Sequence, residues 1–239
     1  MKIALLISGG GTTMQAIIKA CKDNALQGVV PALVIASKEG IGGIQKALDL
    51  GIKEKDILVL NPKAFADNSL YGEAILAECK KRNVDFIGQY GWLVKTPSNV
   101  IEAYKNMIIN QHPGPLDTGR PDFGGVGMYG MRVHQARLEF VRRTNKDFWT
   151  EATAHRVTVD FDEGKIVKRK QVPIFQNDTA EILQARVLPI EHEVQIETLR
   201  DFANGNVSEF IRETPLVLPS EEKILEECKQ LAIKMYPKG

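Results

Sequence analysis

The sequence predicts an α/β fold with a Rossmann-like, mostly parallel twisted sheet flanked by helices, followed by a C-terminal β-hairpin and further helices. Two observations support this prediction. In the first half of the 239 residues, short apolar runs alternate with segments of helical periodicity, and three successive glycines end the first apolar run. Strands that alternate with helices form βαβ units, so the sheet is expected to be parallel and buried on both faces.

Runs rich in Ile, Leu and Val predict the parallel strands, at residues 2–8, 29–36, 56–60, 84–87 and 107–109. The helices expected between them span residues 12–22, 44–50, 71–82 and 97–105. In the first helix, Met14, Ile17, Ile18 and Cys21 share one face. Such sheets bind ligands outside the carboxyl ends of their strands, which directs attention to residues 8–13, 89–96 and 110–115.

The second half begins with a long glycine-rich loop at residues 116–131. The elements expected after it are a helix at 132–145, hairpin strands at 152–160 and 166–173, and a helix at 179–204 interrupted near Pro189. The tail from residue 219 predicts one more helix, whose apolar stripe should pack on the body of the protein. That stripe consists of Ile224, Leu225, Cys228, Leu231, Ala232 and Met235.

Composition and charge argue against several classes of protein. With 31 basic and 30 acidic residues the net charge is +1, which argues against a nucleic acid as the main partner. No run approaches the ~18 apolar residues of a membrane span, and the first apolar run is too short for a signal peptide. Cys21, Cys79 and Cys228 lie too far apart to indicate a disulfide framework or a zinc site. We therefore expect a soluble cytoplasmic protein without a metal.

The loop at residues 8–13, Ser-Gly-Gly-Gly-Thr-Thr, joins the first strand to the first helix. Backbone N–H groups at a helix start, free of obstructing side chains, form an anion site. The loop lacks the GK[ST] ending of a triphosphate-binding loop, and Met14 stands where a dinucleotide fingerprint needs its third glycine. A monophosphate suits it best. The alternative is a flexible turn without a ligand.

Asn110 and His112 end the fifth apolar run and project to the same side of a strand. An amide donor beside an imidazole can stabilise an oxyanion and move a proton. A structural histidine at a strand end is an equal alternative on this pattern alone. The acidic residues at 160–164 are typical of a turn as well as of a catalytic carboxylate.

Four segments together resemble the glycinamide ribonucleotide formyltransferases, a family of folate-dependent enzymes. They are Ser-Gly-Gly-Gly-Thr-Thr-Met-Gln-Ala-Ile-Ile at 8–18, Ile-Asn-Gln-His-Pro at 109–113, the segment 157–164 that ends in Asp162-Glu163-Gly164, and Glu191-His192. They occur in the family's order and spacing across roughly residues 1–205, which implies a catalytic domain at 1–205. Residues 206–239 are then a C-terminal helical extension packed on the same domain.

The resemblance implies a transfer of the formyl group from 10-formyltetrahydrofolate to the primary amine of glycinamide ribonucleotide, in purine biosynthesis. It assigns catalysis to Asn110, His112 and Asp162, with a protonated His112. It assigns substrate binding to Gly11, Thr12, Thr13 and Glu191, and binding of the folate to Trp92, Leu93, Val94 and Lys95. His155 and Thr153 match family residues near the site. The implied partners are the phosphorylated amine and the folate, without nucleic acid or membrane; a homodimer is left open.

The chain also departs from the family pattern. Thr13, Asn68 and Leu93 replace a common Asn, a basic residue and an Arg. A glycine-rich insertion at 117–131 extends the short loop of the family, and the tail after about residue 205 has no recognised counterpart. Other functions therefore stay open: an N-formyltransferase for an amino-sugar nucleotide, or a non-catalytic nucleotide-binding module. The insertion is expected to be a lid over bound ligands or, through Phe123, Met128 and Tyr129, a contact between subunits.

Overall fold

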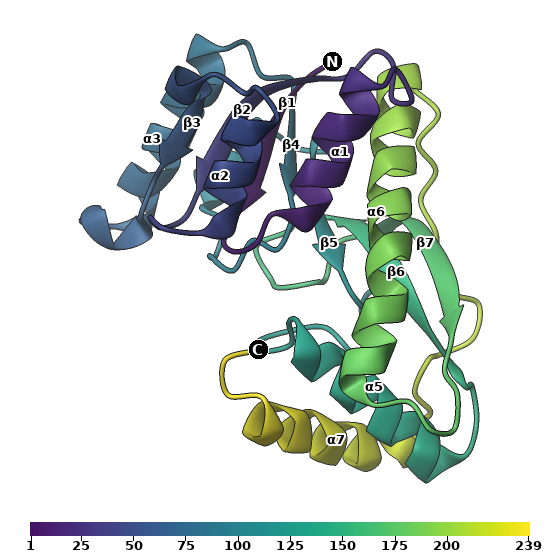
Figure 1. Cartoon of the computed structure of the whole chain (residues 1–239). Coiled ribbons are helices and arrows are strands. Elements are labelled where there is room, and N and C mark those ends of the chain that lie inside the picture. The colour runs from purple at the N-terminus through teal and green to yellow at the C-terminus, as the bar shows by residue number, and fades with distance from the viewer. The chain divides into compact units, whose positions relative to one another are not determined.

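The computed structural model describes residues 1–239, and the chain divides into two compact units (Figure 1). The first unit comprises Met1–Gln111 and Gln195–Val207, and the second comprises His112–Val194 and Ser208–Gly239. The first unit carries a parallel sheet with the strand order β3-β2-β1-β4-β5. Its strands are β1 (Lys2–Ile7), β2 (Val30–Ala36), β3 (Ile57–Val59), β4 (Phe86–Gln89) and β5 (Ile108–His112). Each overlaps one of the five predicted runs, so the parallel α/β prediction is confirmed.

The helices of the first unit cover both faces of this sheet. They are α1 (Thr12–Lys22), α2 (Gly42–Asp49), α3 (Asn68–Lys81) and α4 (Ser98–Ala103). Figure 1 shows α1 and α2 in front of the sheet and α3 behind it. The central strand β1 is therefore buried on both sides, and Ile3 and Leu5 are fully inaccessible to solvent. Helix α3 begins at Asn68, earlier than the predicted residue 71, because the Asp67 side chain accepts a hydrogen bond from the Leu70 N–H at 2.8 Å.

The second unit contains an antiparallel strand pair, β6 (Trp149–Arg156) and β7 (Ile166–Pro173). The predicted strand at 152–160 was wrong at both ends. Strand β6 starts earlier because Glu151 is fully buried and forms ion pairs with Arg169 and Arg212, so a charged residue occupies a strand interior. It ends at Arg156 because the chain then turns, with the Thr158 hydroxyl donating to the Asp160 carbonyl at 2.9 Å.

Three helices and a short 3₁₀ turn complete the chain. The helices are α5 (Met131–Thr144), α6 (Ala180–Asn204) and α7 (Glu222–Met235), and the 3₁₀ turn is Pro219–Glu221. Helix α6 is continuous, with Pro189 inside it rather than at an interruption. None of the helices is long and apolar enough to cross a membrane.

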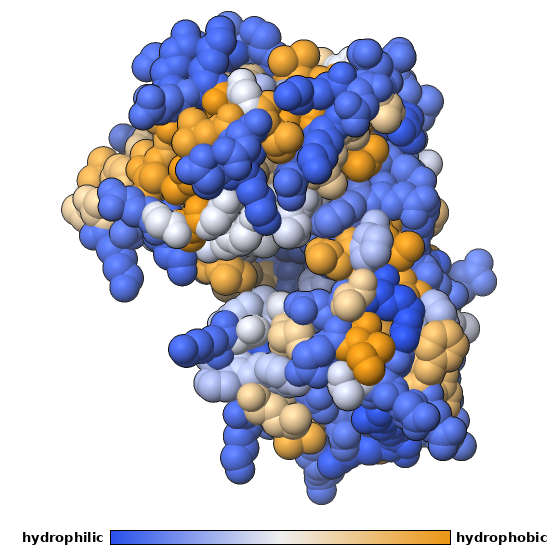
Figure 2. Space-filling view, in the orientation of Figure 1, coloured by the Kyte–Doolittle hydropathy of each residue, from blue (hydrophilic) through white to orange (hydrophobic).

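Helix α7 packs on α5 through one hydrophobic cluster, as predicted for the tail, but Met235 at the end of the predicted stripe is 50% exposed. From α7 the cluster takes Leu225, Cys228 and Ala232, and from α5 it takes Val133, Ala136 and Phe140. Figure 2 shows mainly hydrophilic side chains along the outer side of α7, as expected for an amphipathic helix. The predicted division between residues 1–205 and 206–239 stays a prediction.

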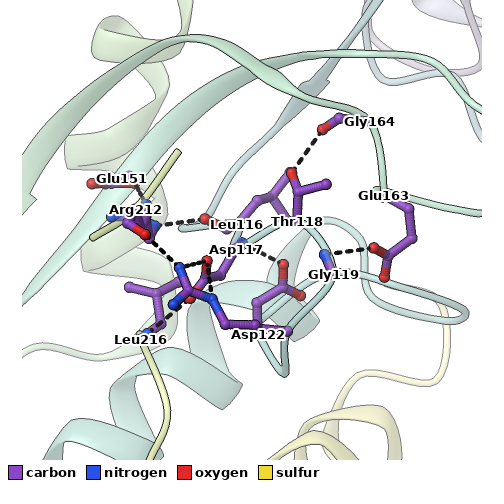
Figure 3. Close-up of polar contacts among 11 residues, drawn as sticks. Leu116, Asp117, Thr118, Gly119, Asp122, Glu151, Glu163, Gly164, Arg212 and Leu216 are labelled. Atoms are coloured by element: carbon purple, nitrogen blue, oxygen red, sulfur yellow. Dashed lines mark hydrogen bonds and ion pairs between the residues drawn. The ribbon is translucent and has the colours of Figure 1, made fainter. Parts of the chain in front are cut away.

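The glycine-rich insertion is irregular along its whole length, as predicted, but it is firmly held (Figure 3). The Thr118 hydroxyl donates to the Gly164 carbonyl at 3.2 Å, and the Gly119 N–H donates to Glu163 at 3.0 Å. The Asp117 carboxylate accepts the Leu216 N–H at 3.0 Å. These bonds anchor the start of the insertion to two other segments of the second unit, which argues against a lid that opens as a whole.

The predicted subunit contact through the insertion is wrong for two of its three side chains. Phe123 is fully buried and Met128 is 4% exposed, because both belong to the hydrophobic cluster beneath α7. Side chains that fill the core of their own unit cannot contact a second copy of the chain. In this protein the insertion is therefore part of the packed body of the second unit.

Candidate functional site

The loop between β1 and α1 has the geometry of an anion site. Gly11 adopts a left-handed conformation with φ of 64°, and a Cβ there would lie 2.8 Å from the Gly43 Cα, so the position requires glycine. The first bond inside α1 runs from the Gln15 N–H to the Gly11 carbonyl at 2.9 Å, and no side chain caps the helix. The N–H groups of Thr12 and Thr13 precede that bond and can serve a bound anion.

A basic side chain that the sequence analysis missed lies beside this loop. Lys46 in α2 donates its Nζ to the Gly10 carbonyl at 2.8 Å. Its ammonium group thus adds a full positive charge to the partial charge of the α1 N-terminus. No motif or spacing in the sequence connects Lys46 to the loop, because only the packing of α2 beside α1 brings the two together.

In the first unit, the loop predicted to bind phosphate contacts the segment predicted to hold the folate. The Ser8 hydroxyl accepts hydrogen bonds from the Leu93 N–H at 3.0 Å and from the Ser37 hydroxyl at 2.9 Å. Within residues 92–95, the Leu93 side chain is 56% exposed and the buried Trp92 indole nitrogen has no hydrogen-bond partner. The segment combines an exposed apolar side chain with an unused donor.

In the second unit, Asp162 lies between two histidines. Its Oδ2 is 3.6 Å from His112 Nδ1, and its Oδ1 is 3.4 Å from His155 Nε2. The Gly125 N–H donates to Oδ2 at 2.9 Å, and the other ring nitrogen of His112 lies 3.2 Å from the Phe123 carbonyl. The structure thus brings together the predicted catalytic residues His112 and Asp162, from a strand end and a loop that are 50 residues apart in sequence.

Burial controls the charges of this pair. It lowers the pKa of His112 to about 4, although the Asp162 carboxylate and the Phe123 carbonyl favour the charged ring. Burial also opposes ionisation of Asp162, but the two histidines and the Gly125 N–H hold its pKa below its usual range. In the free protein at pH 7, a neutral His112 therefore faces an ionised Asp162. Burial disfavours an imidazolium ion in the free protein because it removes the water that would solvate the charge. That a protonated His112 acts during the reaction stays a prediction.

The remaining predicted residues lie on three elements. Asn110 precedes His112 by two residues in β5, so strand alternation gives both side chains the same face. Glu191 in α6 is buried, with 4% of its surface exposed. The Thr153 hydroxyl donates to the Gly114 carbonyl at 2.8 Å, which fixes the chain just beyond His112 and gives this residue a supporting role.

The sequence analysis missed the backbone that surrounds the histidine–aspartate pair. The Phe123 carbonyl and the Gly125 N–H contact the pair, and Lys229 of α7 donates to the Gly124 carbonyl between them at 2.9 Å. The glycine content of the insertion was the one available signal, since glycine permits close approach of the backbone. Nothing in the sequence pattern points to Lys229.

Comparisons with known proteins identify the family of the chain. A family model described as formyl transferase matches residues 1–199. A chloroplastic phosphoribosylglycinamide formyltransferase of Vigna unguiculata is 37% identical over 83% of this chain and 59% of its own length. The enzyme of that name from Escherichia coli strain K12 is 28% identical over 87% of this chain and 89% of its own length.

Solved structures lead to the same family. Glycinamide ribonucleotide transformylase 1 from Symbiobacterium toebii superposes with a TM-score of 0.74 and 29% identity, covering 86% of this chain and 88% of its own. The chain spans 59% and 64% of the lengths of two of the chloroplastic relatives that it matches, from Vigna unguiculata and Arabidopsis thaliana. With 199 of its 239 residues matched by the family model, the chain belongs to the formyl transferase family.

Proposed function

We propose that this protein transfers the formyl group of 10-formyltetrahydrofolate to the primary amine of glycinamide ribonucleotide. The observation that supports the proposal most strongly is the buried pair of His112 and Asp162, in a chain whose relatives carry the name of that activity. Titratable groups whose pKa values are shifted by burial and by a charged partner cluster at catalytic sites, which favours an enzyme over a binding module. The proposed catalytic residues are Asn110, His112 and Asp162.

The reaction needs a stabilised oxyanion. The amine nitrogen attacks the formyl carbon, a C–N bond forms, and the formyl oxygen takes the negative charge. The Asn110 amide donates a hydrogen bond to that oxygen, which is worth about 10²–10³ in rate when such a donor is well placed. The bond between the formyl carbon and N10 of the folate then breaks, and the carbonyl re-forms.

The reaction also moves one proton from the amine to N10. His112 is neutral at pH 7, so its ring can accept, through water, the proton that the amine loses and later return it by the same route to N10. During that interval the ring is an imidazolium ion between two acceptors, the Asp162 carboxylate and the Phe123 carbonyl. Asp162 therefore stabilises the charged intermediate and keeps the ring oriented.

The two ligands are assigned to the elements that suit their chemistry. Gly11, Thr12 and Thr13 would hold the phosphate, with Lys46 as the neighbouring cation. Glu191 would bind the ribose, because a carboxylate accepts hydrogen bonds from vicinal hydroxyl groups. The folate would lie against residues 92–95, where Leu93 offers an exposed apolar surface.

One other acceptor deserves a direct comparison. An amino-sugar nucleotide also presents a primary amine and phosphate, and Thr13 and Leu93 differ from the common family residues. We favour the ribonucleotide because the α1 N-terminus suits a monophosphate. We further propose that the protein acts on small molecules in the cytoplasm; a homodimer stays a prediction.

The test is a comparison of acceptors. Purified protein is supplied with 10-formyltetrahydrofolate and either glycinamide ribonucleotide or an amino-sugar nucleotide, and release of tetrahydrofolate is followed. The proposal predicts a kcat/KM for glycinamide ribonucleotide in the usual enzymatic range of about 10⁴ M⁻¹s⁻¹ or more. A higher kcat/KM for the sugar nucleotide would replace the proposed acceptor, and no release with either would favour a binding module.

A further inference from the structure

We propose that Lys229, in the C-terminal helix beyond the segment that the family model covers, is a positioning residue for the His112–Asp162 pair. Lys229 acts through residues 122–125, because it holds their backbone against the side chains of His112 and Asp162. The inference rests on the proposed function in that His112 and Asp162 are taken as the catalytic pair. It extends that function by making the C-terminal extension part of the catalytic apparatus.

Phe123 and Gly125 contact the pair through backbone atoms. The Phe123 carbonyl lies 3.2 Å from His112 Nε2, and the Gly125 N–H donates to Asp162 Oδ2 at 2.9 Å. The Asp122 carboxylate accepts the Gly124 N–H at 2.8 Å, which closes a tight turn. One short turn therefore sets an acceptor on the imidazole and a donor on the carboxylate at the same time.

This turn approaches Asp162 too closely for any residue except glycine at its centre. A Cβ on Gly124 would lie 2.7 Å from the Asp162 Cβ and 2.6 Å from a methyl carbon of Leu116. Real Cβ atoms do not come so close, so a side chain at position 124 would push the turn and Asp162 apart. The absence of a side chain is what lets the backbone reach the pair.

Lys229 holds the same glycine from the other side. Its Nζ donates to the Gly124 carbonyl at 2.9 Å, and burial lowers the pKa of its ammonium group against the opposing charges around it. Those charges come from three segments of the second unit: Asp122, Glu226, Asp162 and Glu163. The ammonium group thus links α7 to the turn by a charge-assisted bond and faces the acidic side of the site.

The packing of α7 supports this role. The Phe123 side chain is buried in the same cluster as Leu225 and Cys228, which lie on α7 close to Lys229 in sequence. Helix α7 therefore fixes the turn twice, by apolar contact with the side chain of residue 123 and by a hydrogen bond to the carbonyl of residue 124. Asp122 orients the peptide group before Gly124, and the Lys229 bond holds the carbonyl of the next peptide group, whose N–H at Gly125 donates to Asp162.

The test compares Lys229→Met with Lys229→Arg, and uses Lys223→Met, an exposed lysine of the same helix, as the matched control. Loss of a hydrogen bond from a charged group corresponds to about a 10- to 100-fold effect. We expect kcat of Lys229→Met to fall by that factor with little change in either KM. Arginine should restore most of kcat, and the Lys223 variant should match the wild type.

A second readout does not depend on activity. Because the Gly125 N–H donates to Asp162, we expect its hydrogen exchange to be about 10- to 100-fold faster in Lys229→Met than in the wild type. If the wild type does not formylate glycinamide ribonucleotide but this acceleration is observed, the proposed function fails and the positioning role stands. Unchanged exchange at Gly125, or a normal kcat in Lys229→Met with only a lower melting temperature, would overturn the inference.

If Lys229→Met does not fold, Gly124→Ala tests the same turn by a change at its central residue. Its added methyl group should push the turn away from Asp162, lower kcat and accelerate the exchange of the Gly125 N–H. A Gly124→Ala variant with wild-type kcat and wild-type exchange would contradict the role given to the turn.

Discussion

Replacing Asp162 by Asn removes the charge that faces His112 while keeping the size of the side chain. The amide oxygen can still accept the Gly125 N–H, so the loop should keep its conformation. In the proposed mechanism, the change therefore acts on the imidazolium ion that forms during proton transfer. Opposite unit charges 3.6 Å apart interact by about 5 kcal/mol where the effective dielectric constant is about 20. We expect kcat to fall by about 10³, with KM for the phosphorylated amine almost unchanged.

Steady-state release of tetrahydrofolate measures both constants for Asp162→Asn. Asp160→Asn is the matched control, because it makes the same change on an exposed residue of the same loop. The control should keep wild-type kcat. A loss of less than tenfold in Asp162→Asn, or an equal loss in the control, would refute the idea that the carboxylate stabilises a charged His112.

Three further predictions concern binding and stability. Gly11→Ala should raise KM for the phosphorylated amine by about tenfold or more, because the left-handed backbone at Gly11 disfavours a side chain. Gly9→Ala is the control and should leave KM unchanged, because the space around Gly9 is open. Equal effects of both variants on KM would contradict the assignment of the anion site. The free energy of unfolding should fall as the pH drops from about 6.5 toward 4. Burial lowers the pKa of His112 to about 4 and that of His134 to about 3, so the unfolded chain binds protons that the folded chain does not. A free energy of unfolding that stays constant between those pH values would contradict this prediction. Leu225→Ala should cost about 2–5 kcal/mol of stability by calorimetry, and a wild-type melting temperature would show that α7 does not contribute to the core.

The fold of the first unit could be predicted because its residues follow simple physical patterns. A strand such as β1, buried on both faces, needs an unbroken run of apolar residues, and a short helix such as α1 needs one apolar stripe. The helix start at Asn68 was misplaced since its cap, Asp67, satisfies the backbone without any apolar signal. In the second unit, the start of β6 was missed because Glu151 is buried by ion pairs that come from distant residues.

The candidate site was predictable only where side chains carry the chemistry. His112 and Asp162 belong to motifs with a fixed spacing, and the structure places them 3.6 Å apart. The contributions of Phe123 and Gly125 are backbone groups, which any residue type supplies, so no residue pattern reveals them. Lys46 and Lys229 reach their partners across 36 and 105 residues of sequence, and only the packing of α2 and α7 determines those contacts.

The most direct test of the central claim follows a ¹³C-labelled formyl group by NMR from 10-formyltetrahydrofolate in the presence of glycinamide ribonucleotide. The account predicts that the label appears as a formamide on the substrate nitrogen. It also predicts that His112→Ala slows this appearance by about 10²–10⁴ without unfolding the protein. Label released as free formate, or transfer at the wild-type rate by His112→Ala, would contradict the claim that this pair carries out formyl transfer to an amine.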